Sequence, residues 1–336
     1  MNFLGNSLKD SFNRNINYIR LSVTDRCDFR CLYCMAEEMT FLPRDQVLSL
    51  EEMLIVAKCF VKLGVNKIRI TGGEPLVRKN IMWLMEELGQ LKGLDQLVIT
   101  TNGSQLEKYA ADLKKAGVKR INVSMDSLDE QRFAKITRTG KLDKVLAGLD
   151  EAHRVGFRDT KINAVILKGF NDDEILDLVD FIKQRNMHIS FIEEMPLGNV
   201  DYQRKDTFIT SDTIKSVIEQ KHTLLPSNKS TTGPSKYHQL DNSDSLIGFI
   251  SPNTHNFCAQ CNRVRVTVEG RLLLCLGNEH SVDLRKILRT PQLSGAQLEQ
   301  SIETAIIDSM AIKPYSHEFN IEEAPRLVRF MSTTGG

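Results

Sequence analysis

Six of the seven cysteines fall into two compact groups, and the first group has the spacing C-x₃-C-x₂-C across Cys27, Cys31 and Cys34. Three thiolates this close together can hold a [4Fe–4S] cluster and leave one iron without a protein ligand. A structural zinc site is the alternative, but such sites usually pair two C-x₂-C halves or add histidine, and no histidine lies near this group. The spacing therefore favours an iron–sulfur cluster whose open iron can bind a small molecule.

The second group, Cys258, Cys261 and Cys275, has the spacing C-x₂-C-x₁₃-C and again lacks a fourth thiolate. Cys275 lies near the end of a predicted strand, so a hairpin can return it to the first pair. Zinc stays open here, because His255 and His280 are available as ligands. Paired with the first group, a second [4Fe–4S] cluster with an open iron is the favoured interpretation. Cys59 stands apart in an apolar helical run and is interpreted as a buried small hydrophobe without a role.

Basic residues follow the second group directly, in the segment Asn262–Thr267. Alternation along a strand would send Arg263, Arg265 and Thr267 to one face. Two guanidinium groups side by side suit phosphate, although a solvated strand face is the simpler alternative. The chain has no G-x-x-x-x-G-K-[ST] loop, so a nucleotide would have to be held by cations on strands. Further candidates for this role are Arg20, Arg69 and Lys161.

Short apolar runs alternate with amphipathic stretches over the first 195 residues, which predicts a parallel sheet with crossover helices. Six such units are two short of a full (β/α)₈ barrel, so we expect an incomplete (β/α)₆ TIM-type barrel. The first cysteine group follows the first strand, on the rim where active sites gather in such barrels. The predicted strands are Tyr18–Val23, Lys67–Thr71, Gln96–Thr101, Arg120–Met125, Lys161–Leu167 and Ile189–Met195, and the predicted helices are Leu50–Leu63, Asn80–Leu91, Ser104–Ala116, Leu142–Val155 and Asp173–Arg185.

The last third of the chain has a different pattern. Residues 226–245 are polar and rich in Ser, Thr, Asn, Gly and Pro, which predicts a loop. Beyond it we expect strands at Leu246–Ser251, Val264–Val268 and Leu272–Leu276, helices at Ser281–Arg289 and Ala296–Met310, and no regular structure over Met331–Gly336. We therefore divide the chain into a barrel core, 1–240, and a smaller α+β region, 241–336, that carries the second cluster.

Composition narrows the class of partner. The 336 residues are 41% hydrophobic and 26% charged, with a net charge of +1, so no nucleic acid or membrane partner is indicated. No stretch reaches the ~20 apolar residues needed to span a bilayer, and the N-terminus does not look like a signal peptide. We expect a cytoplasmic protein.

The first cysteine group, with Tyr33 before its last cysteine and Gly72-Gly73-Glu74-Pro75 downstream, resembles the radical S-adenosylmethionine (SAM) superfamily. The resemblance implies that a reduced [4Fe–4S] cluster cleaves SAM to methionine and a 5′-deoxyadenosyl radical. It also implies that SAM contacts Tyr33, Gly73, Ser124 and Met195.

A narrower resemblance covers nearly the whole chain. Tyr18–Cys27, Phe257–Thr267, Cys275-Leu276 and the terminal Gly335-Gly336 are similar to the GTP 3′,8-cyclase family of molybdenum cofactor biosynthesis. In that family the radical removes the C3′ hydrogen of GTP, the sugar radical adds to C8 of guanine, and a second cluster meets the purine. No protein side chain is implied as acid, base or nucleophile, and the Gly-Gly tail would reach into the active site. The implied GTP contacts are Arg20, Arg69, Thr100, Lys161, Arg263 and Arg265.

The resemblance also implies a homodimer, a reducing electron donor, and the next enzyme of the pathway, cyclic pyranopterin monophosphate synthase, as partners. Asp28, Ala36 and Thr334 replace the Asn, Pro and Ile frequent in the family and leave the ligands untouched. One rival is another two-cluster radical SAM enzyme, such as a peptide-modifying maturase, which often has more C-terminal cysteines and lacks the Arg-x-Arg pair. A zinc-stabilised binding protein is the non-enzymatic rival.

Overall fold

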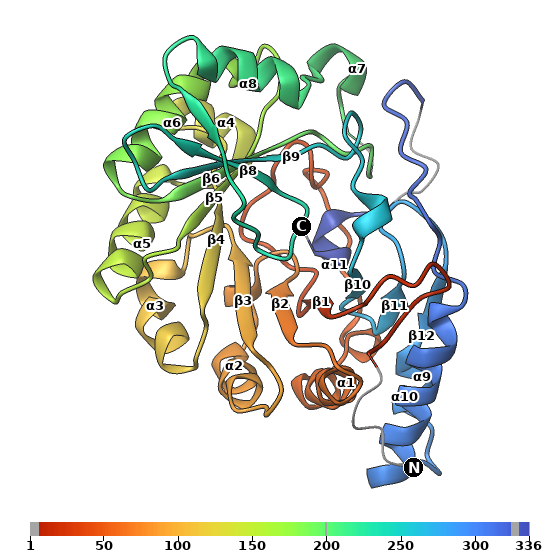
Figure 1. Cartoon of the computed structure of the whole chain (residues 1–336). Coiled ribbons are helices and arrows are strands. Elements are labelled where there is room, and N and C mark those ends of the chain that lie inside the picture. The colour runs from red at the N-terminus through yellow and green to blue at the C-terminus, as the bar shows by residue number, and fades with distance from the viewer. Residues whose placement is uncertain (1–6, 199, 324–328, 336) are drawn as a thin grey trace.

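Six parallel strands that alternate with helices form the centre of the fold (Figure 1). The structure is a computed structural model and describes residues 7–198, 200–323 and 329–335. Twelve strands of the described chain form one sheet, in the order β12-β11-β10-β1-β2-β3-β4-β5-β6-β9-β8-β7. Their bounds are β1 Tyr18–Ser22, β2 Lys67–Thr71, β3 Gln96–Thr101, β4 Arg120–Ser124, β5 Lys161–Val165, β6 His188–Ile192, β7 Leu224–Pro226, β8 Lys236–Leu240, β9 Leu246–Ile250, β10 Arg263–Val266, β11 Arg271–Leu273 and β12 Ser281–Asp283.

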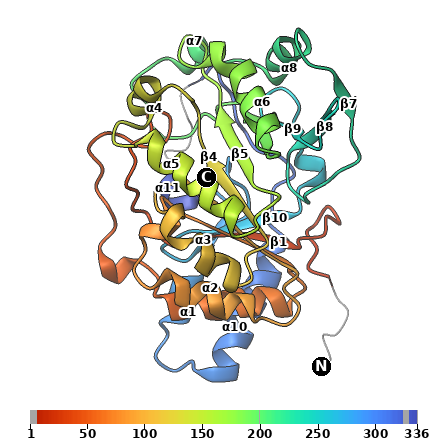
Figure 2. The same ribbon diagram turned by 90° about the vertical axis from the view of Figure 1, so that its left-hand side faces the viewer.

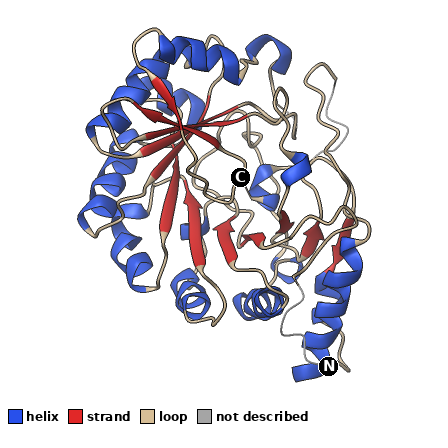
Figure 3. Ribbon diagram, viewed as in Figure 1, coloured by secondary structure: helices blue, strands red, loops and turns tan. Residues whose placement is uncertain are grey.

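Helices cover the outside of the curved sheet, and the strands converge inside them (Figure 3). Each helix of the barrel core buries an apolar stripe, and α1 begins at the capping box of Ser49 and Glu52. The helices are α1 Leu50–Lys62, α2 Ile81–Gly89, α3 Leu106–Lys115, α4 Glu130–Thr137, α5 Leu142–Arg154, α6 Ile175–Gln184, α7 Arg204–Thr207, α8 Ser211–Glu219, α9 Leu284–Leu288, α10 Gly295–Met310 and α11 Met331–Thr334. None of the described helices is long and apolar enough to cross a membrane.

The two faces of the barrel strands differ in chemistry. Residues that face the helices, such as Ile19, Ile68 and Ile162, are fully buried members of one hydrophobic core. The residues one position before or after them face the barrel interior and are polar or charged, as with Arg20, Arg69 and Lys161. TIM barrels usually fill their interior with branched apolar side chains. The interior of this barrel is therefore not a hydrophobic core, and its polar side chains can bind a polar ligand.

The C-terminal region extends the barrel at both edges. Strand β9 pairs in parallel with β6, and β10 pairs in parallel with β1. Residues 251–262 therefore have to run from one edge of the open barrel to the other (Figures 1 and 2). These findings confirm the incomplete (β/α)₆ barrel. The division at 240/241 stays a prediction, because strands from both segments share one sheet.

Three expectations from the sequence were wrong in detail. Residues 226–245 are not all loop, because 236–240 form β8, which pairs antiparallel with β9. Only Tyr237 and Leu240 of this strand are buried, so its apolar signal is weak. The expected helix at 281–289 begins as β12, and the chain end folds into α11.

Replacing Gly89 by alanine tests the close contact between α2 and the end of α3. A Cβ atom at Gly89 would lie 1.9 Å from the carbonyl oxygen of Ala116. Alanine normally favours a helix by about 1 kcal/mol over glycine, but this overlap must displace backbone. We predict that Gly89→Ala destabilises the protein by about 1–3 kcal/mol, seen as a lower midpoint of thermal unfolding. Gly233→Ala is the control, since its Cβ meets nothing closer than 3.5 Å; a stabilised Gly89→Ala protein would contradict the packing.

Candidate functional site

Two adjoining cavities lie in the barrel, the first at its rim and the second in its interior. The first contains the side chains of Cys27, Cys31 and Cys34, and the second contains those of Cys258, Cys261 and Cys275. Within each group, the three cysteines predicted from spacing therefore line one cavity, and none of the six thiols is in a disulfide. The cavities share a wall made of Asn163, Ile192, Met195 and Met331.

The first cysteine loop is held from outside by α4, a helix that the sequence analysis did not predict. The backbone N–H of Arg30 donates to the carbonyl of Thr137 at 2.9 Å, and that of Leu32 donates to Ile136 at 3.0 Å. Phe29 packs edge-on against Phe133, with ring centroids 5.9 Å apart. These contacts fix the loop independently of any bound group.

Gly72 and Gly73 are required for a reason that the sequence analysis missed. Both glycines line the first cavity, and they also pack closely against the segment before the cysteine loop. A Cβ at Gly72 would lie 2.5 Å from the carbonyl oxygen of Thr24, and one at Gly73 would lie 2.3 Å from that of Arg26. The glycines therefore allow the end of β2 to pack against the segment that leads into Cys27.

Buried carboxyl groups support the first cavity. Glu74 accepts hydrogen bonds from the N–H groups of Leu76 and Asn102, at 2.9 and 2.6 Å, and burial raises its pKa to about 7. The side-chain amide of Asn102 donates to the Asp28 carboxylate at 2.7 Å, and this bond links the cysteine loop to the end of β3. Asp28, the departure from the family pattern, thus has a structural partner.

The thiols of the first group fit a bound iron–sulfur cluster. Burial, together with the neighbouring acidic groups Glu74 and Asp126 respectively, raises the pKa of Cys27 and of Cys34 to about 12. The thiolate forms therefore need a nearby positive charge, which iron supplies. The described lining of this cavity includes two carboxyl side chains, Glu193 and Glu194, and no lysine or arginine.

The second group is assembled by a hairpin, as predicted. Cys258 and Cys261 lie on the segment that crosses the barrel opening, and Cys275 follows β11, which returns antiparallel to β10. Arg14 fixes this segment by donating to the carbonyls of Cys258 and Tyr315, at 2.8 and 2.7 Å. The thiol of Cys261 differs from the others: burial opposes its ionisation, but Arg263 and Lys313 outweigh burial and lower its pKa.

The histidines considered for zinc lie elsewhere. His255 pairs with Asp212 at 2.8 Å, and His280 contacts Asn278; neither lines the second cavity. Among the described residues, no group of three or more His, Cys, Asp or Glu side chains converges tightly enough for a single metal ion. A [4Fe–4S] cluster does not require such convergence, because its cysteines bind different irons. The geometry thus gives zinc no support.

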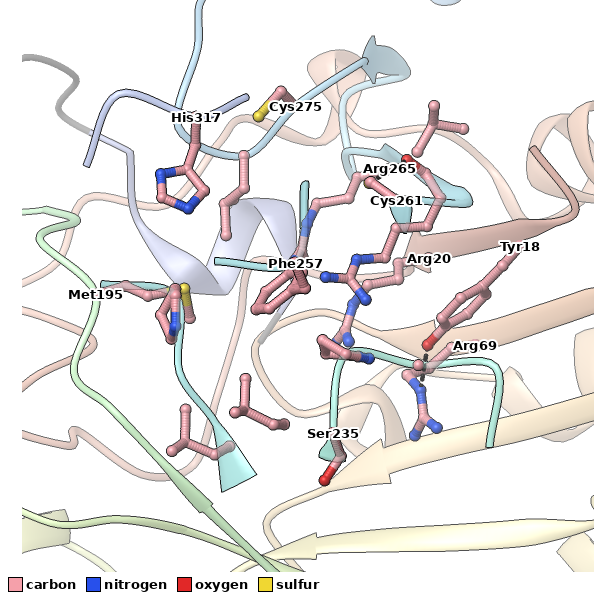
Figure 4. A pocket seen from close by; sticks show the side chains of 18 of the residues that line it. Tyr18, Arg20, Arg69, Met195, Ser235, Phe257, Cys261, Arg265, Cys275 and His317 are labelled. Carbon is pink, nitrogen blue, oxygen red and sulfur yellow. Dashed lines mark hydrogen bonds between the residues drawn. The ribbon is translucent and has the colours of Figure 1, made fainter. Parts of the chain in front are cut away.

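The second cavity is strongly cationic (Figure 4). Its described lining contains no aspartate or glutamate and seven basic side chains, which are Arg20, Lys67, Arg69, Arg120, Lys161, Arg263 and Arg265. Two of them have hydroxyl partners and no carboxylate: Arg69 donates to the Tyr18 side-chain oxygen at 2.7 Å, and Lys161 donates to Ser190 at 3.0 Å. Burying cations without carboxylate partners costs folding free energy, so we expect an anion to bind in this cavity.

Unsatisfied polar atoms, both donors and acceptors, indicate that the same cavity binds a polar ligand. Nε of Arg20, Nε of Arg120, and the side-chain oxygens of Asn122 and Asn163 are buried without a hydrogen-bond partner. All four residues line the second cavity. Buried polar groups in native proteins are normally satisfied, so these atoms are available to a ligand.

The structure brings nearly all the predicted contact residues to the expected cavity. Tyr33, Gly73, Ser124 and Met195 line the first cavity, and the five predicted basic residues line the second. Thr100 lines the first cavity instead, and its hydroxyl accepts from Arg69 at 3.0 Å. Thr267 lies past the end of β10, where it accepts from the N–H of Arg271 at 3.0 Å, and it does not join the arginines.

The C-terminal tail reaches both cavities. Met331 of α11 lines each of them, and Arg265 donates to the carbonyls of Thr334 and Gly335. Gly335 has φ +80°, and a Cβ there would lie 2.1 Å from Thr71 Cγ2, so only glycine fits. Gly336 lies outside the described residues.

Lys67, Arg120, Tyr18 and His317 also line the second cavity and were missed by the sequence analysis. A signal existed for three of them, because Tyr18, Lys67 and Arg120 each stand two residues before a polar residue that faces the interior. Period-two alternation could therefore have found them. His317 has no such signal; it comes from a distant segment, and its Nε2 is buried without a partner.

Family comparisons divide the chain in two. The Radical SAM superfamily matches residues 21–182, and the Molybdenum Cofactor Synthesis C family matches residues 187–319. The chain is 57% identical to a GTP 3′,8-cyclase of Pseudomonas syringae pv. syringae over 331 residues, which cover 98% of both chains. It is 53% identical to a GTP 3′,8-cyclase of Marinobacter nauticus over 330 residues, again covering 98% of each.

Among solved structures, Streptococcus suis SuiB bound to its precursor peptide SuiA matches with a TM-score of 0.58. The match covers 90% of this chain and 67% of SuiB, at 17% identity. At that identity the likeness concerns the fold alone, and it agrees with the partial barrel.

Tyr18 provides a test of the unbalanced charge. Burial alone would raise its pKa, but Arg69, Arg20, Lys67 and Arg263 together lower it to about 6. We predict that cluster-free protein shows tyrosinate absorbance with a midpoint near pH 6, and that Tyr18→Phe removes this step. Inorganic triphosphate should move the midpoint to higher pH, because it offsets the cations. Identical titrations of wild type and Tyr18→Phe would contradict the charge arrangement.

Proposed function

The chain belongs to the GTP 3′,8-cyclase family of the radical SAM superfamily, and on this premise we propose that it converts GTP to (8S)-3′,8-cyclo-7,8-dihydroguanosine 5′-triphosphate. This reaction is the first step of molybdenum cofactor biosynthesis. One observation carries the proposal: two adjoining cavities of opposite charge each contain a cysteine triad. The acidic cavity suits a sulfonium cation, and the basic cavity suits a triphosphate.

Cys27, Cys31 and Cys34 would hold the first cluster. When bound, that cluster supplies the electron that cleaves SAM into methionine and the 5′-deoxyadenosyl radical. The chain's own contribution is binding: the carboxylate of Glu193 on the cavity wall favours the sulfonium and ammonium groups of SAM, whereas Glu194 is paired with Arg204 at 2.9 Å. The proposed SAM contacts are Tyr33, Gly73, Ser124 and Met195.

The basic side chains of the second cavity would bind the triphosphate of GTP. Arg263 and Arg265 point from one strand and Arg20 from its neighbour, so their guanidinium donors can reach one anion from two sides. Lys67 and Arg120 join the predicted set, since they line the same space. Thr100 would act through Arg69, whose guanidinium donates to its hydroxyl.

The wall shared by the cavities is where the ribose of GTP would meet SAM. Asn163, Ile192, Met195 and Met331 line both spaces, so the ribose of a GTP bound in the second cavity can approach SAM in the first one there. Holding both reactants across this wall gives the proximity on which radical transfer depends. The protein thus supplies orientation and charge, while the cofactors carry the chemistry.

A second [4Fe–4S] cluster on Cys258, Cys261 and Cys275, with its open iron toward the purine, completes the proposal. The three thiols share one cavity with the arginines, which supports the assignment. The Gly-Gly tail would close this space, because Arg265 already holds the carbonyl of Gly335.

A peptide-modifying maturase remains the rival function, and the full-length identity to cyclases disfavours it. We further propose a cytoplasmic homodimer whose product passes to cyclic pyranopterin monophosphate synthase. The division into a barrel core, 1–240, and a C-terminal region, 241–336, is part of the same proposal.

The reaction itself is the first test. Anaerobically reconstituted protein, reduced with dithionite, should release 5′-deoxyadenosine from SAM at a rate that rises with GTP, and mass spectrometry should find the cyclised product. Metal analysis should find about eight irons and eight labile sulfides per chain. A rate of 5′-deoxyadenosine release that does not depend on GTP would contradict the cyclase activity. Zinc without labile sulfide would contradict the assignment to the radical SAM enzymes.

Arg263 and Arg265 are the second test. A hydrogen bond to a charged group contributes about 1.5–3 kcal/mol, so Arg263→Ala or Arg265→Ala should lower kcat/KM for GTP about 10- to 100-fold. Iron content should stay unchanged. Lys286→Ala, an exposed basic residue on α9, is the matched control. Loss of iron in the arginine variants would instead indicate a structural role.

A further inference from the structure

A basic groove lies on the far side of the first cysteine loop from the SAM cavity. It is bordered by the segment that leads into Cys27, by the end of the long connection between β1 and α1, and by the turn before α2. Figure 2 shows that connection, in red and orange, running along one edge of the molecule. The residues that line the groove are Thr24, Asp25, Arg26, Leu42, Arg44, Val47, Leu48, Ser49, Val77, Arg78, Lys79, Asn80 and Arg289.

The groove is positively charged. Five of the lining side chains are basic, and the one carboxylate among them, Asp25, is buried and accepts the N–H of Leu42 at 2.7 Å. Glu52 neutralises one of the five by pairing with Arg289 at 2.7 Å. Arg26, Arg44 and Lys79 remain exposed to solvent.

Two helices add to this potential, because their N-termini open on the groove. Ser49 is the N-cap of α1, and Asn80 is the N-cap of α2. The N-terminus of a helix carries a partial positive charge. Glu51 and Glu52 in the first turn of α1 offset part of the contribution of that helix, whereas α2 has no acidic residue in its first turn.

Only one chain segment separates this groove from the first cavity. Thr24, Asp25 and Arg26 line the groove, and the next residue, Cys27, lines the cavity. The N–H of Gly73, which also lines the cavity, donates to the Thr24 carbonyl at 2.8 Å. The groove is therefore the outer surface of the wall that carries a proposed cluster ligand.

The proposed reaction consumes electrons. SAM, GTP, two electrons and one proton give methionine, 5′-deoxyadenosine and the cyclised product. The first electron breaks the C5′–S bond of SAM, and the second, with the proton, reduces the substrate radical after the C3′–C8 bond has formed. No group of the chain can supply these electrons repeatedly, so an external carrier has to deliver them.

We propose that the basic groove docks an acidic one-electron carrier protein, which reduces the first cluster through the wall at Arg26 and Cys27. This inference rests on the proposed function. Exposed charges around a groove suit a transient protein encounter, and electron-transfer complexes have small interfaces. Opposite charge would steer the carrier to this face and raise its association rate about 10- to 1,000-fold.

The test separates delivery of electrons from catalysis. The double variant Arg44→Glu/Lys79→Glu reverses two exposed charges of the groove, and neither residue lines the SAM or GTP cavity. With limiting reduced flavodoxin, an acidic carrier, its rate of 5′-deoxyadenosine formation should fall about tenfold or more. With dithionite, its rate should equal that of wild type. High salt should lower the flavodoxin-driven rate of wild type toward that of the variant.

The matched control is Lys115→Glu/Lys119→Glu, two exposed lysines near the start of β4, at the other end of the barrel. It should keep both rates. An unchanged flavodoxin rate in the groove variant, or an equal loss with both reductants, would overturn the docking proposal. If wild type with dithionite fails to turn over GTP, the proposed function fails instead. Titration of oxidised flavodoxin against wild type and variant would still test docking, with weaker binding expected for the variant and equal binding contradicting the proposal.

Discussion

Buried positive charge is concentrated inside the barrel, and it constrains what the interior can hold. Strands that alternate with period two put apolar side chains under the helices and basic ones into the interior. The same alternation that builds the hydrophobic core therefore creates a space that needs an anion. The lowered pKa of Tyr18 expresses this imbalance, because four cations outweigh the cost of burying a phenolate.

The two cysteine groups reach this space by different routes. Cys27 and its partners sit on the rim loop after β1, which α4 fixes from outside. Cys258 and Cys261 lie on the segment that joins strands at opposite edges of the open barrel. The incomplete barrel leaves the opening that this segment crosses, which a closed barrel would not have.

Charge is partitioned over three adjoining spaces. The basic interior, the acidic first cavity and the basic groove outside the cysteine loop follow one another across the β1 end of the barrel. The charge of each space is opposite to that of the group proposed to bind there, which is a triphosphate, a sulfonium and an acidic electron carrier in turn. The opposed charges also discourage either small ligand from binding in the wrong cavity.

Spacing and alternation are local properties, and they were enough to predict the six parallel strands and the two cysteine groups. The family resemblance supplied most of the predicted contact residues, nearly all of which line the expected cavity. The tertiary structure decided what depends on register and distant packing. It placed His317, which comes from a distant segment, in the basic cavity, and it placed Thr100 in the first one. It also formed β8 and α11, whose sequences carry little local signal, since pairing with β9 and packing over the barrel stabilise them. Finally, it showed that Gly72 and Gly73 serve strand packing, a contact between segments far apart in sequence that no local pattern could reveal.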